Sequence, residues 1–109
     1  MGITKKDLFT SKQNEIASIS KVLGHPARIA ILQHLMETEG CICGGLVQET
    51  GLAQATVSQH LRELKQIGLI KGQIEGTSVC YCIDKEKWKE VQDLLMNYFQ
   101  QGLIDSSCC

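Results

Sequence analysis

Two cysteines separated by one residue, Cys41 and Cys43, stand shortly before a polar stretch that runs from Ala53 to Leu61. Thiolates select soft metal ions, so this pair is a candidate soft-ion site. The polar stretch has the residue types and spacing of a helix that enters the major groove of DNA. An ion held directly before such a helix would change the affinity for DNA, and the two features together indicate a sensor.

The six cysteines form three close pairs: Cys41 and Cys43, Cys80 and Cys82, and Cys108 and Cys109. Partners this close in sequence rarely form a disulfide with each other, because the bond requires specific Cα separations. The N-terminus lacks an apolar signal region, which predicts a cytoplasmic protein whose thiols stay reduced. We therefore expect metal binding or redox sensing from these pairs. No apolar run is long enough to cross a bilayer, so we expect no membrane partner.

The 109 residues are expected to form one domain with a small core, to which a partner subunit would add stability. The net charge of -1 is unusual for a small DNA-binding domain. The charges are unevenly distributed, however. Residues 53–73 carry three cations, Arg62, Lys65 and Lys71, against one acid, Glu63. A surplus this small predicts few phosphate contacts and a moderate salt dependence.

Apolar periodicity and turn residues predict four helices, a hairpin and a last helix. The predicted helices cover residues 5–23, a stretch from His25 and Pro26 to before Gly40, residues from about 43 or 45 to 50, residues 53–67 and residues 85–101. The predicted strands cover 69–75 and 78–84, joined at Gly76 and Thr77. The predicted fold is mainly α with a small β-hairpin (α+β), a winged helix-turn-helix. In the single domain 1–109 the helix-turn-helix covers about 43–67, the wing about 69–84, the C-terminal helix about 85–101, and a mobile, cysteine-containing tail 102–109.

Each helix is expected to bury one apolar stripe. The expected stripes are Ile29, Leu32, Leu35 and Met36 in the second helix, Val57, Leu61, Leu64 and Ile67 in the fourth, and Trp88, Val91, Leu95 and Tyr98 in the last, widened by Leu94 and Phe99. The apolar face of the first helix is broad for a surface helix, so part of it is expected to cover a partner subunit.

Outside its stripe, the fourth helix leaves polar residues free to face DNA. The residues expected to contact DNA from this helix are Gln54, Thr56, Ser58, Gln59, His60 and Arg62. Those expected to bind phosphates and sugars from the flank and the wing are Lys65, Lys71, Gln73 and Thr77. Gln bonds adenine bidentately, while Ser and Thr serve bases or phosphates. The alternative is a merely solvated helix face, and His60 could instead bond within the protein.

Three motifs in these elements resemble the ArsR/SmtB family of bacterial metal-responsive repressors: LGHPARIAIL at 23–32, QATVSQHL at 54–61, and GLIK at 68–71 with Gly76 and Tyr81. The resemblance covers roughly residues 16–100. It implies a homodimer that represses genes and releases its operator when an inducer binds, with the first and last helices paired to their symmetry mates. The expected DNA partner is a double-stranded operator with an inverted repeat. One departure is Ala53, where a Ser cap worth ~1 kcal/mol is common.

Within that family, the Cys41-Ile-Cys43 segment resembles the arsenic-type inducer motif. The expected inducer is therefore arsenite, As(III), with antimonite, cadmium, lead or zinc as other candidates. The fuller motif has a further Cys where this chain has Leu46, so a third sulfur is expected from Cys108 or Cys109.

The positions of Cys41 and Cys43 at a helix start carry two further expectations. A helix N-terminus would lower the pKa of the thiols. Residues two apart on a helix point in nearly opposite directions, so joint binding of one ion requires an unwound helix start. The neighbouring Gly40, Gly44 and Gly45 would make that distortion easy.

Other uses of the cysteines stay open. Cys80 and Cys82 alternate along a strand, so both point to one face, where they could bind a second ion, act in a redox switch or do neither. The whole set could serve a redox- or persulfide-sensing repressor of the same fold, or a structural zinc site in a protein-interaction module. The family's zinc site on the last helix is not expected, because residues 84–101 contain no His. No enzyme motif is present, and we expect no catalysis.

Overall fold

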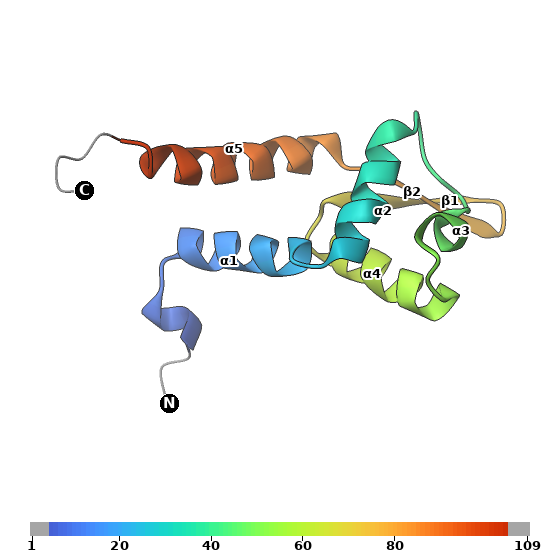
Figure 1. The fold of residues 1–109 in the computed structure, drawn as a ribbon, viewed down its shortest axis with the longest axis horizontal. Coiled ribbons are helices and arrows are strands. Elements are labelled where there is room, and N and C mark those ends of the chain that lie inside the picture. The colour runs from blue at the N-terminus through green and yellow to red at the C-terminus, as the bar shows by residue number, and fades with distance from the viewer. Residues whose placement is uncertain (1–4, 105–109) are drawn as a thin grey trace.

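The computed structural model describes residues 5–104, which form the helices and strands of a winged helix-turn-helix (Figure 1). In chain order these are a 3-10 helix at Lys5–Leu8, α1 Ser11–Leu23, α2 Pro26–Glu37, α3 Leu46–Thr50, α4 Gln54–Gln66, β1 Ile70–Glu75, β2 Ser78–Ile83 and α5 Lys85–Gln101. Helices α2, α3 and α4 lie with the hairpin at one end of the molecule, and α1 and α5 extend from it side by side. This order of elements confirms the predicted fold class. Within 5–104, no helix is both long and apolar enough to cross a membrane.

The first predicted helix, 5–23, is in fact two helices separated at Thr10. The Thr10 side chain accepts a hydrogen bond from the Gln13 backbone N–H at 3.1 Å, and the Gln13 side chain accepts one from the Thr10 N–H at 2.9 Å. This reciprocal capping box holds Thr10 in an extended conformation and begins α1 one residue later. The capping signal outweighs the apolar periodicity that made the two segments look continuous.

The starts of the later helices follow their local sequences. His25 caps α2 by accepting a hydrogen bond from the Ala27 N–H at 3.3 Å, and Pro26 occupies the first helical position as predicted. Ala53 leaves the start of α4 without a side-chain cap, which confirms the expected departure. The Asp84 carboxylate accepts from the Lys87 N–H at 3.2 Å, and α5 has its predicted bounds.

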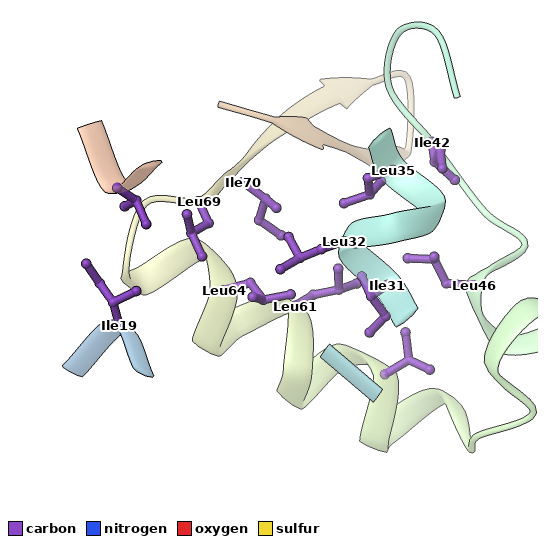
Figure 2. Packing of buried hydrophobic residues seen from close by; sticks show 12 residues of the cluster. Ile19, Ile31, Leu32, Leu35, Ile42, Leu46, Leu61, Leu64, Leu69 and Ile70 are labelled. Carbon is purple, nitrogen blue, oxygen red and sulfur yellow. The ribbon is translucent and has the colours of Figure 1, made fainter. Parts of the chain in front are cut away.

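The core lies between α2, α4 and the start of the wing (Figure 2). Its residues are Ile19, Ile31, Leu32, Leu35, Ile42, Leu46, Val57, Leu61, Leu64, Leu69, Ile70 and Val91. The stripe predicted for α4 is confirmed, with Ile67 half-buried at its end. Close packing around these side chains fixes the angle at which α4 leaves the body of the protein.

The stripe predicted for α2 is partly wrong, because Ile29 and Met36 are 46% and 51% exposed. The face turned to the core carries Ile31, Leu32 and Leu35, and Arg28 completes that face one turn earlier. The apolar spacing predicted that Ile29 would be buried, whereas its neighbour Arg28 faces the core instead. A partly buried arginine interrupts the apolar periodicity, so the sequence pattern did not indicate it.

The stripe predicted for α5 is buried only in its first half. Val91 is buried and Trp88, Leu94 and Leu95 are partly buried, whereas Tyr98 and Phe99 are 53% and 67% exposed. These two aromatic residues lie on the part of α5 that extends beyond the body of the protein (Figure 1).

The hairpin pairs β1 with β2 in an antiparallel register around a two-residue turn. Lys71 lies opposite Cys82 and Gln73 opposite Cys80, while Gly76 takes the positive φ of 62° that the turn requires. Both strands are one residue shorter than predicted at their outer ends. Because side chains alternate along a strand, the two cysteines of β2 share one face of the hairpin with Lys71 and Gln73.

Candidate DNA-binding face and thiol cluster

The helix-turn-helix is formed by α3, the turn at Gly51 and α4. Gly51 adopts a positive φ of 72°, and its N–H donates to the Val47 carbonyl at 2.8 Å. The Thr50 hydroxyl donates to the Leu46 carbonyl at 2.7 Å and accepts from the Leu52 N–H at 3.2 Å. These bonds fix the direction in which the chain enters α4.

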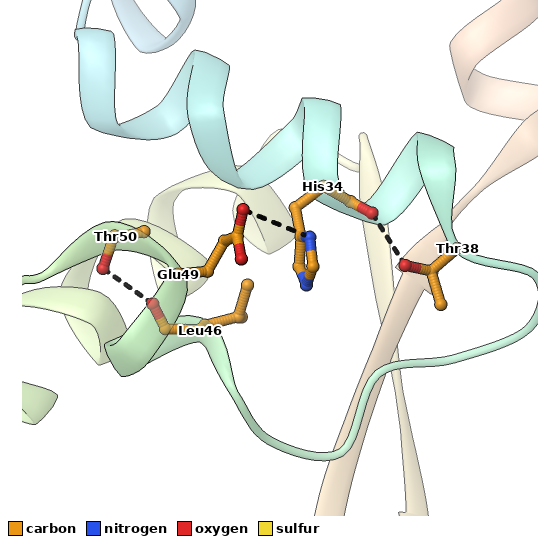
Figure 3. Close-up of polar contacts among 5 residues, drawn as sticks. All are labelled: His34, Thr38, Leu46, Glu49 and Thr50. Carbon is orange, nitrogen blue, oxygen red and sulfur yellow. Dashed lines mark hydrogen bonds and ion pairs between the residues drawn. The ribbon is translucent and has the colours of Figure 1, made fainter.

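A second set of contacts ties α3 to α2 (Figure 3). His34 Nδ1 lies 3.8 Å from Glu49 Oε1, and Thr38 closes the end of α2 by donating to the His34 carbonyl at 3.0 Å. The His34–Glu49 pair is partly exposed, so its contribution to stability is small. Buried Leu46 and partly buried Val47 also attach α3 to the core.

Four of the polar residues predicted to face DNA are exposed on α4: Gln54, Thr56, Gln59 and Arg62. A fifth, Ser58, is partly buried. In this structure they bond to one another. Gln54 donates to Ser58 at 3.1 Å, Arg62 donates to Gln59 at 2.8 Å, and Gln59 donates to Glu63 at 3.2 Å. Exposed bonds of this kind exchange readily for other acceptors, because each contributes little on its own.

The positively charged and polar residues predicted on the flank and wing separate into two groups. Lys71 and Gln73 lie on the cysteine face of the hairpin, where Gln73 accepts a hydrogen bond from Cys41 Sγ at 3.1 Å. Lys65 lies over the opposite face, since a Cβ on Gly72 would be 3.5 Å from Lys65 Nζ. Thr77 is exposed in the hairpin turn.

His60 was predicted to face DNA, and this is wrong. Its side chain is buried, and Nδ1 accepts a hydrogen bond from Arg28 Nε at 3.0 Å. The His25 ring packs edge-on against it with centroids 4.4 Å apart. His60 is three residues beyond Val57 and therefore belongs to the buried stripe of α4. Within the described chain, its Nε2 is buried without a hydrogen-bond partner.

The environment of His60 disfavours the charged imidazolium. Burial lowers its pKa below the ordinary 6.5, and the nearby His25 and Arg28 lower it further. The ring is therefore neutral, with Nδ1 as the acceptor that Arg28 requires.

Cys41 and Cys43 lie before α3 rather than on it. They flank Ile42 in an extended segment, and Ile42 pairs with Tyr81 of β2 as an antiparallel bridge. Ile42 N–H donates to the Tyr81 carbonyl at 2.7 Å, and Tyr81 N–H donates to the Ile42 carbonyl at 2.8 Å. The two Cys-x-Cys segments, which are far apart in the sequence, are therefore neighbours in the fold. We call their residues Cys41, Cys43, Cys80 and Cys82 the thiol cluster.

The cluster consists of two facing pairs. Cys43 forms a disulfide with Cys80 across 37 residues of sequence, with their Cα atoms 3.9 Å apart. Cys41 and Cys82, which lie opposite each other on the other side of the Ile42–Tyr81 bridge, are free thiols. The prediction that the thiols stay reduced therefore does not hold for the pair Cys43–Cys80 in this structure. Non-hydrogen-bonded positions of an antiparallel ladder bring side chains especially close, which explains both pairings.

Acidic and thiol groups dominate the electrostatics of the cluster. The Cys41–Cys82 hydrogen bond and burial raise the pKa of Cys41 above its ordinary 9.0, and the negative charges of Cys82 and Glu75 add to this, against the opposing effect of Lys71. The expected lowering by a helix N-terminus is wrong, because α3 begins only at Leu46.

One carboxylate stands within reach of the same sulfurs. Glu75 Oε2 lies 3.8 Å from Cys43 Sγ, and ligand atoms of Cys43, Glu75 and Cys80 all lie within 4.8 Å of one another. The predicted tail ligands Cys108 and Cys109 lie outside the described residues.

Comparisons with known proteins agree with this geometry. Residues 23–73 match the family model of a helix-turn-helix domain. The HTH-type transcriptional regulator YgaV of Escherichia coli is 32% identical over 97 residues, which are 89% of this chain and 98% of YgaV. This chain belongs to the ArsR/SmtB family of transcriptional regulators. Members of this family are DNA-binding regulators rather than enzymes.

A further relative and a solved structure of the same fold are also similar to this chain. A cadmium resistance transcriptional regulatory protein, the CadC homolog of Staphylococcus aureus, is 34% identical over 80% of this chain and 72% of its own length. The homodimeric winged helix-turn-helix domain of Mb0332 from Mycobacterium bovis, a possible ArsR-family regulator, has the same fold with a TM-score of 0.64. It is 23% identical, and the match covers 96% of this chain and 94% of that domain.

Replacing His60 tests its buried neutral state. Because its pKa in the folded state is below 6.5, the unfolded chain binds more protons, and folding loses stability as the pH falls below 6.5. His60→Gln keeps an acceptor for Arg28 but does not titrate. We expect urea unfolding between about pH 7.5 and about pH 5.5 to show a smaller loss of stability in the variant. Parallel losses in the two proteins would contradict a neutral buried His60.

Proposed function

We propose that the chain is a homodimeric repressor that binds double-stranded operator DNA and releases it when arsenite or a similar thiophilic ion binds Cys41 and Cys43. The observation that carries this proposal is the position of the two thiols. They flank Ile42, whose buried side chain belongs to the same core as α3 and α4. A movement of this segment is therefore transmitted to the recognition helix by close packing.

The exposed side of α4 supports DNA binding. Its polar residues are held on a rigid helix by the buried stripe on the opposite side, so they are presented together to a groove. In a symmetric dimer two such helices would enter successive major grooves ~34–36 Å apart on an inverted repeat. The wing would add contacts to phosphates through Thr77 and Lys71.

The projecting ends of α1 and α5 support the dimer. Large apolar side chains are exposed there: Leu8, Phe9, Met96, Tyr98, Phe99, Leu103 and Ile104. A groove of about 450 Å³ between the two helices is lined by Ile16, Ala17 and Tyr98. Large apolar side chains left exposed at one end of a molecule favour association there. The neighbouring Mb0332 domain is itself homodimeric.

The thiols support an ion as the inducer. Thiolates select thiophilic ions, and the related CadC homolog is named for cadmium resistance. Arsenite is the proposed ion because of the Cys-x-Cys motif, with antimonite, cadmium, lead or zinc as alternatives. Release requires a coupling free energy between the ion and DNA sites of typically ~1–3 kcal/mol. From the sequence, the third sulfur that binds the ion is expected to come from Cys108 or Cys109.

The disulfide Cys43–Cys80 favours a second candidate function, a thiol redox sensor with the same DNA-binding role. This bond links the segment before α3 to the wing, so its formation would also affect the recognition helix. Release by an oxidant and recovery with a reductant, both without an ion, would distinguish this function from ion sensing. A structural zinc module that binds only proteins is disfavoured by membership of a DNA-binding family.

Gln59→Ala tests base reading by α4. We expect the variant to bind operator DNA more weakly by ~1–3 kcal/mol, the range for loss of one bidentate base contact. Fluorescence anisotropy with a labelled operator measures the change. Gln33→Ala on the exposed face of α2 is the matched control and should bind normally. Equal affinities for all three proteins would exclude a role of Gln59 in DNA binding.

Phe99→Glu tests the proposed dimer surface. A charge on the exposed part of α5 would have to be desolvated in the dimer, so we expect sedimentation equilibrium to show mainly monomer and operator affinity to fall. Gln100→Glu introduces the same charge on the neighbouring residue and is the control. A Phe99→Glu protein that remains dimeric would place the interface elsewhere.

Cys41→Ser combined with Cys43→Ser tests the inducer site. Under reducing conditions the variant should bind operator DNA as the original protein does, because Ser differs from Cys by one atom and the exposed polar residues of α4 are unchanged. Arsenite should release the original protein from DNA and leave the variant bound. Normal arsenite release from the double variant would show that the inducer binds elsewhere.

A further inference from the structure

Two Cys-x-Cys segments meet side by side at the base of the wing. Ile42 and Tyr81 exchange both backbone hydrogen bonds, so the residues on either side of them occupy closely approaching positions. Residues two apart in extended chain point to the same side, and all four sulfurs therefore gather on one face. Cys43 and Cys80 are joined by a disulfide, and the free thiols Cys41 and Cys82 lie opposite each other on the other side of the bridge.

We propose that Cys41, Cys43, Cys80 and Cys82 form one site for a thiophilic cation within a single subunit. Cys80 and Cys82, rather than the C-terminal cysteine pair, complete the coordination begun by Cys41 and Cys43. The regulatory consequence of this inference rests on the proposed function, whereas the ion site itself stands on the geometry of the cluster.

The burial of the four cysteines favours a site completed from within. Cys80 is fully buried and Cys82 is partly buried, so the inner wall of the site already consists of sulfur. Cys41 and Cys82 line a groove of about 800 Å³ beside Lys71, through which an ion can enter.

The charges at the cluster favour a cation. Glu75 stands 3.8 Å from Cys43 Sγ and offers a carboxylate oxygen beside the sulfurs. Ligand atoms of Cys43, Glu75 and Cys80 lie within 4.8 Å of one another, so the carboxylate is a further donor at the site.

The coordination chemistry balances with these residues alone. Arsenite, As(OH)₃, reacts with three thiols to give three As–S bonds and three waters. A divalent ion such as cadmium binds four thiols as thiolates and releases four protons. The disulfide must first be reduced: a phosphine takes oxygen from one water, becomes a phosphine oxide and leaves the thiols of Cys43 and Cys80.

Such a site would join the wing to the helix-turn-helix. Cys80 and Cys82 belong to β2, while Cys43 lines a second groove together with Gln54, the first residue of α4, and Val57. An ion that sets the separation of the two Cys-x-Cys segments therefore also sets the position of the wing relative to α4. Both elements are needed for contact with one operator half-site.

The test compares three double variants of the full chain, each reduced with a phosphine. They are Cys80→Ser with Cys82→Ser, Cys41→Ser with Cys43→Ser, and Cys108→Ser with Cys109→Ser. Cadmium is titrated while the thiolate-to-cadmium absorption is followed, and arsenite and cadmium are each added to the protein bound to a labelled operator. We expect one ion per subunit in the original protein and in the 108/109 variant.

In the 80/82 variant we expect cadmium affinity to fall by more than the 10–100-fold that loss of an outer-shell partner costs. Should that variant fail to fold, as judged by circular dichroism, Cys82→Ser alone serves, because Cys82 is partly exposed and unbonded to another sulfur. Unchanged affinity in the 80/82 protein or in Cys82→Ser, or two ions per subunit, would overturn the inference.

The arsenite and cadmium arms separate the two kinds of ion. Loss of arsenite release in the 41/43 variant together with full release in the 80/82 variant would overturn this inference for the arsenic site but leave the proposed function intact. Conversely, one cadmium per subunit that is lost in both the 41/43 and the 80/82 variants, while neither arsenite nor cadmium releases the operator, would support the site and refute the proposed function.

Discussion

The backbone of Ile42 exchanges two hydrogen bonds with Tyr81, and most features of the functional region depend on this short pairing. It places the Ile42 side chain in the core beneath α3 and α4, and it turns the flanking cysteines toward β2. Without it, the segment before α3 would be an ordinary surface loop. With it, β2 of the wing and the segment that leads into α3 share a strand-like contact.

A buried polar contact holds the recognition helix from its other side. Arg28 of α2 donates to His60 of α4, and His25, the cap of α2, packs against the same ring. A guanidinium in this position is oriented by a neutral imidazole, which depends on the lowered pKa of His60. The rotation of α4 about its own axis is therefore fixed both by apolar packing and by one directional hydrogen bond. The hydrogen bond allows fewer alternative arrangements than apolar packing does.

Local sequence signals predicted the hairpin, α4 and α5 closely, because caps, turn glycines and apolar spacing there agree with one another. Two predictions are wrong because a polar residue is buried. Arg28 lies on the buried face of α2, where the apolar spacing predicts Ile29, and His60 is buried although the polar pattern of α4 predicts that it faces DNA. The capping box at Thr10 consists of only two side chains, and the longer apolar pattern of residues 5–23 predicts one continuous helix in its place.

The thiol cluster could not be predicted in the same way. Pairing between residues 43 and 80 depends on the register of a strand against a loop 37 residues away, and no periodicity within either segment encodes that register. The matching Cys-x-Cys spacing of the two segments was the one available signal. This spacing indicates that both cysteines of a segment point to the same side of an extended chain. It does not indicate that the cysteines of one segment lie next to those of the other.

The division of α4 into two sides has a consequence for how this regulator could change over evolutionary time. Gln54, Thr56 and Gln59 contribute nothing to the core, and exposed substitutions usually alter stability by less than ~0.5 kcal/mol. On the proposed function, new operator sequences can therefore be adopted by mutation of the exposed side alone, while the buried side preserves the scaffold. Target choice and the response to a chemical signal can diverge independently among descendants of one ancestral gene.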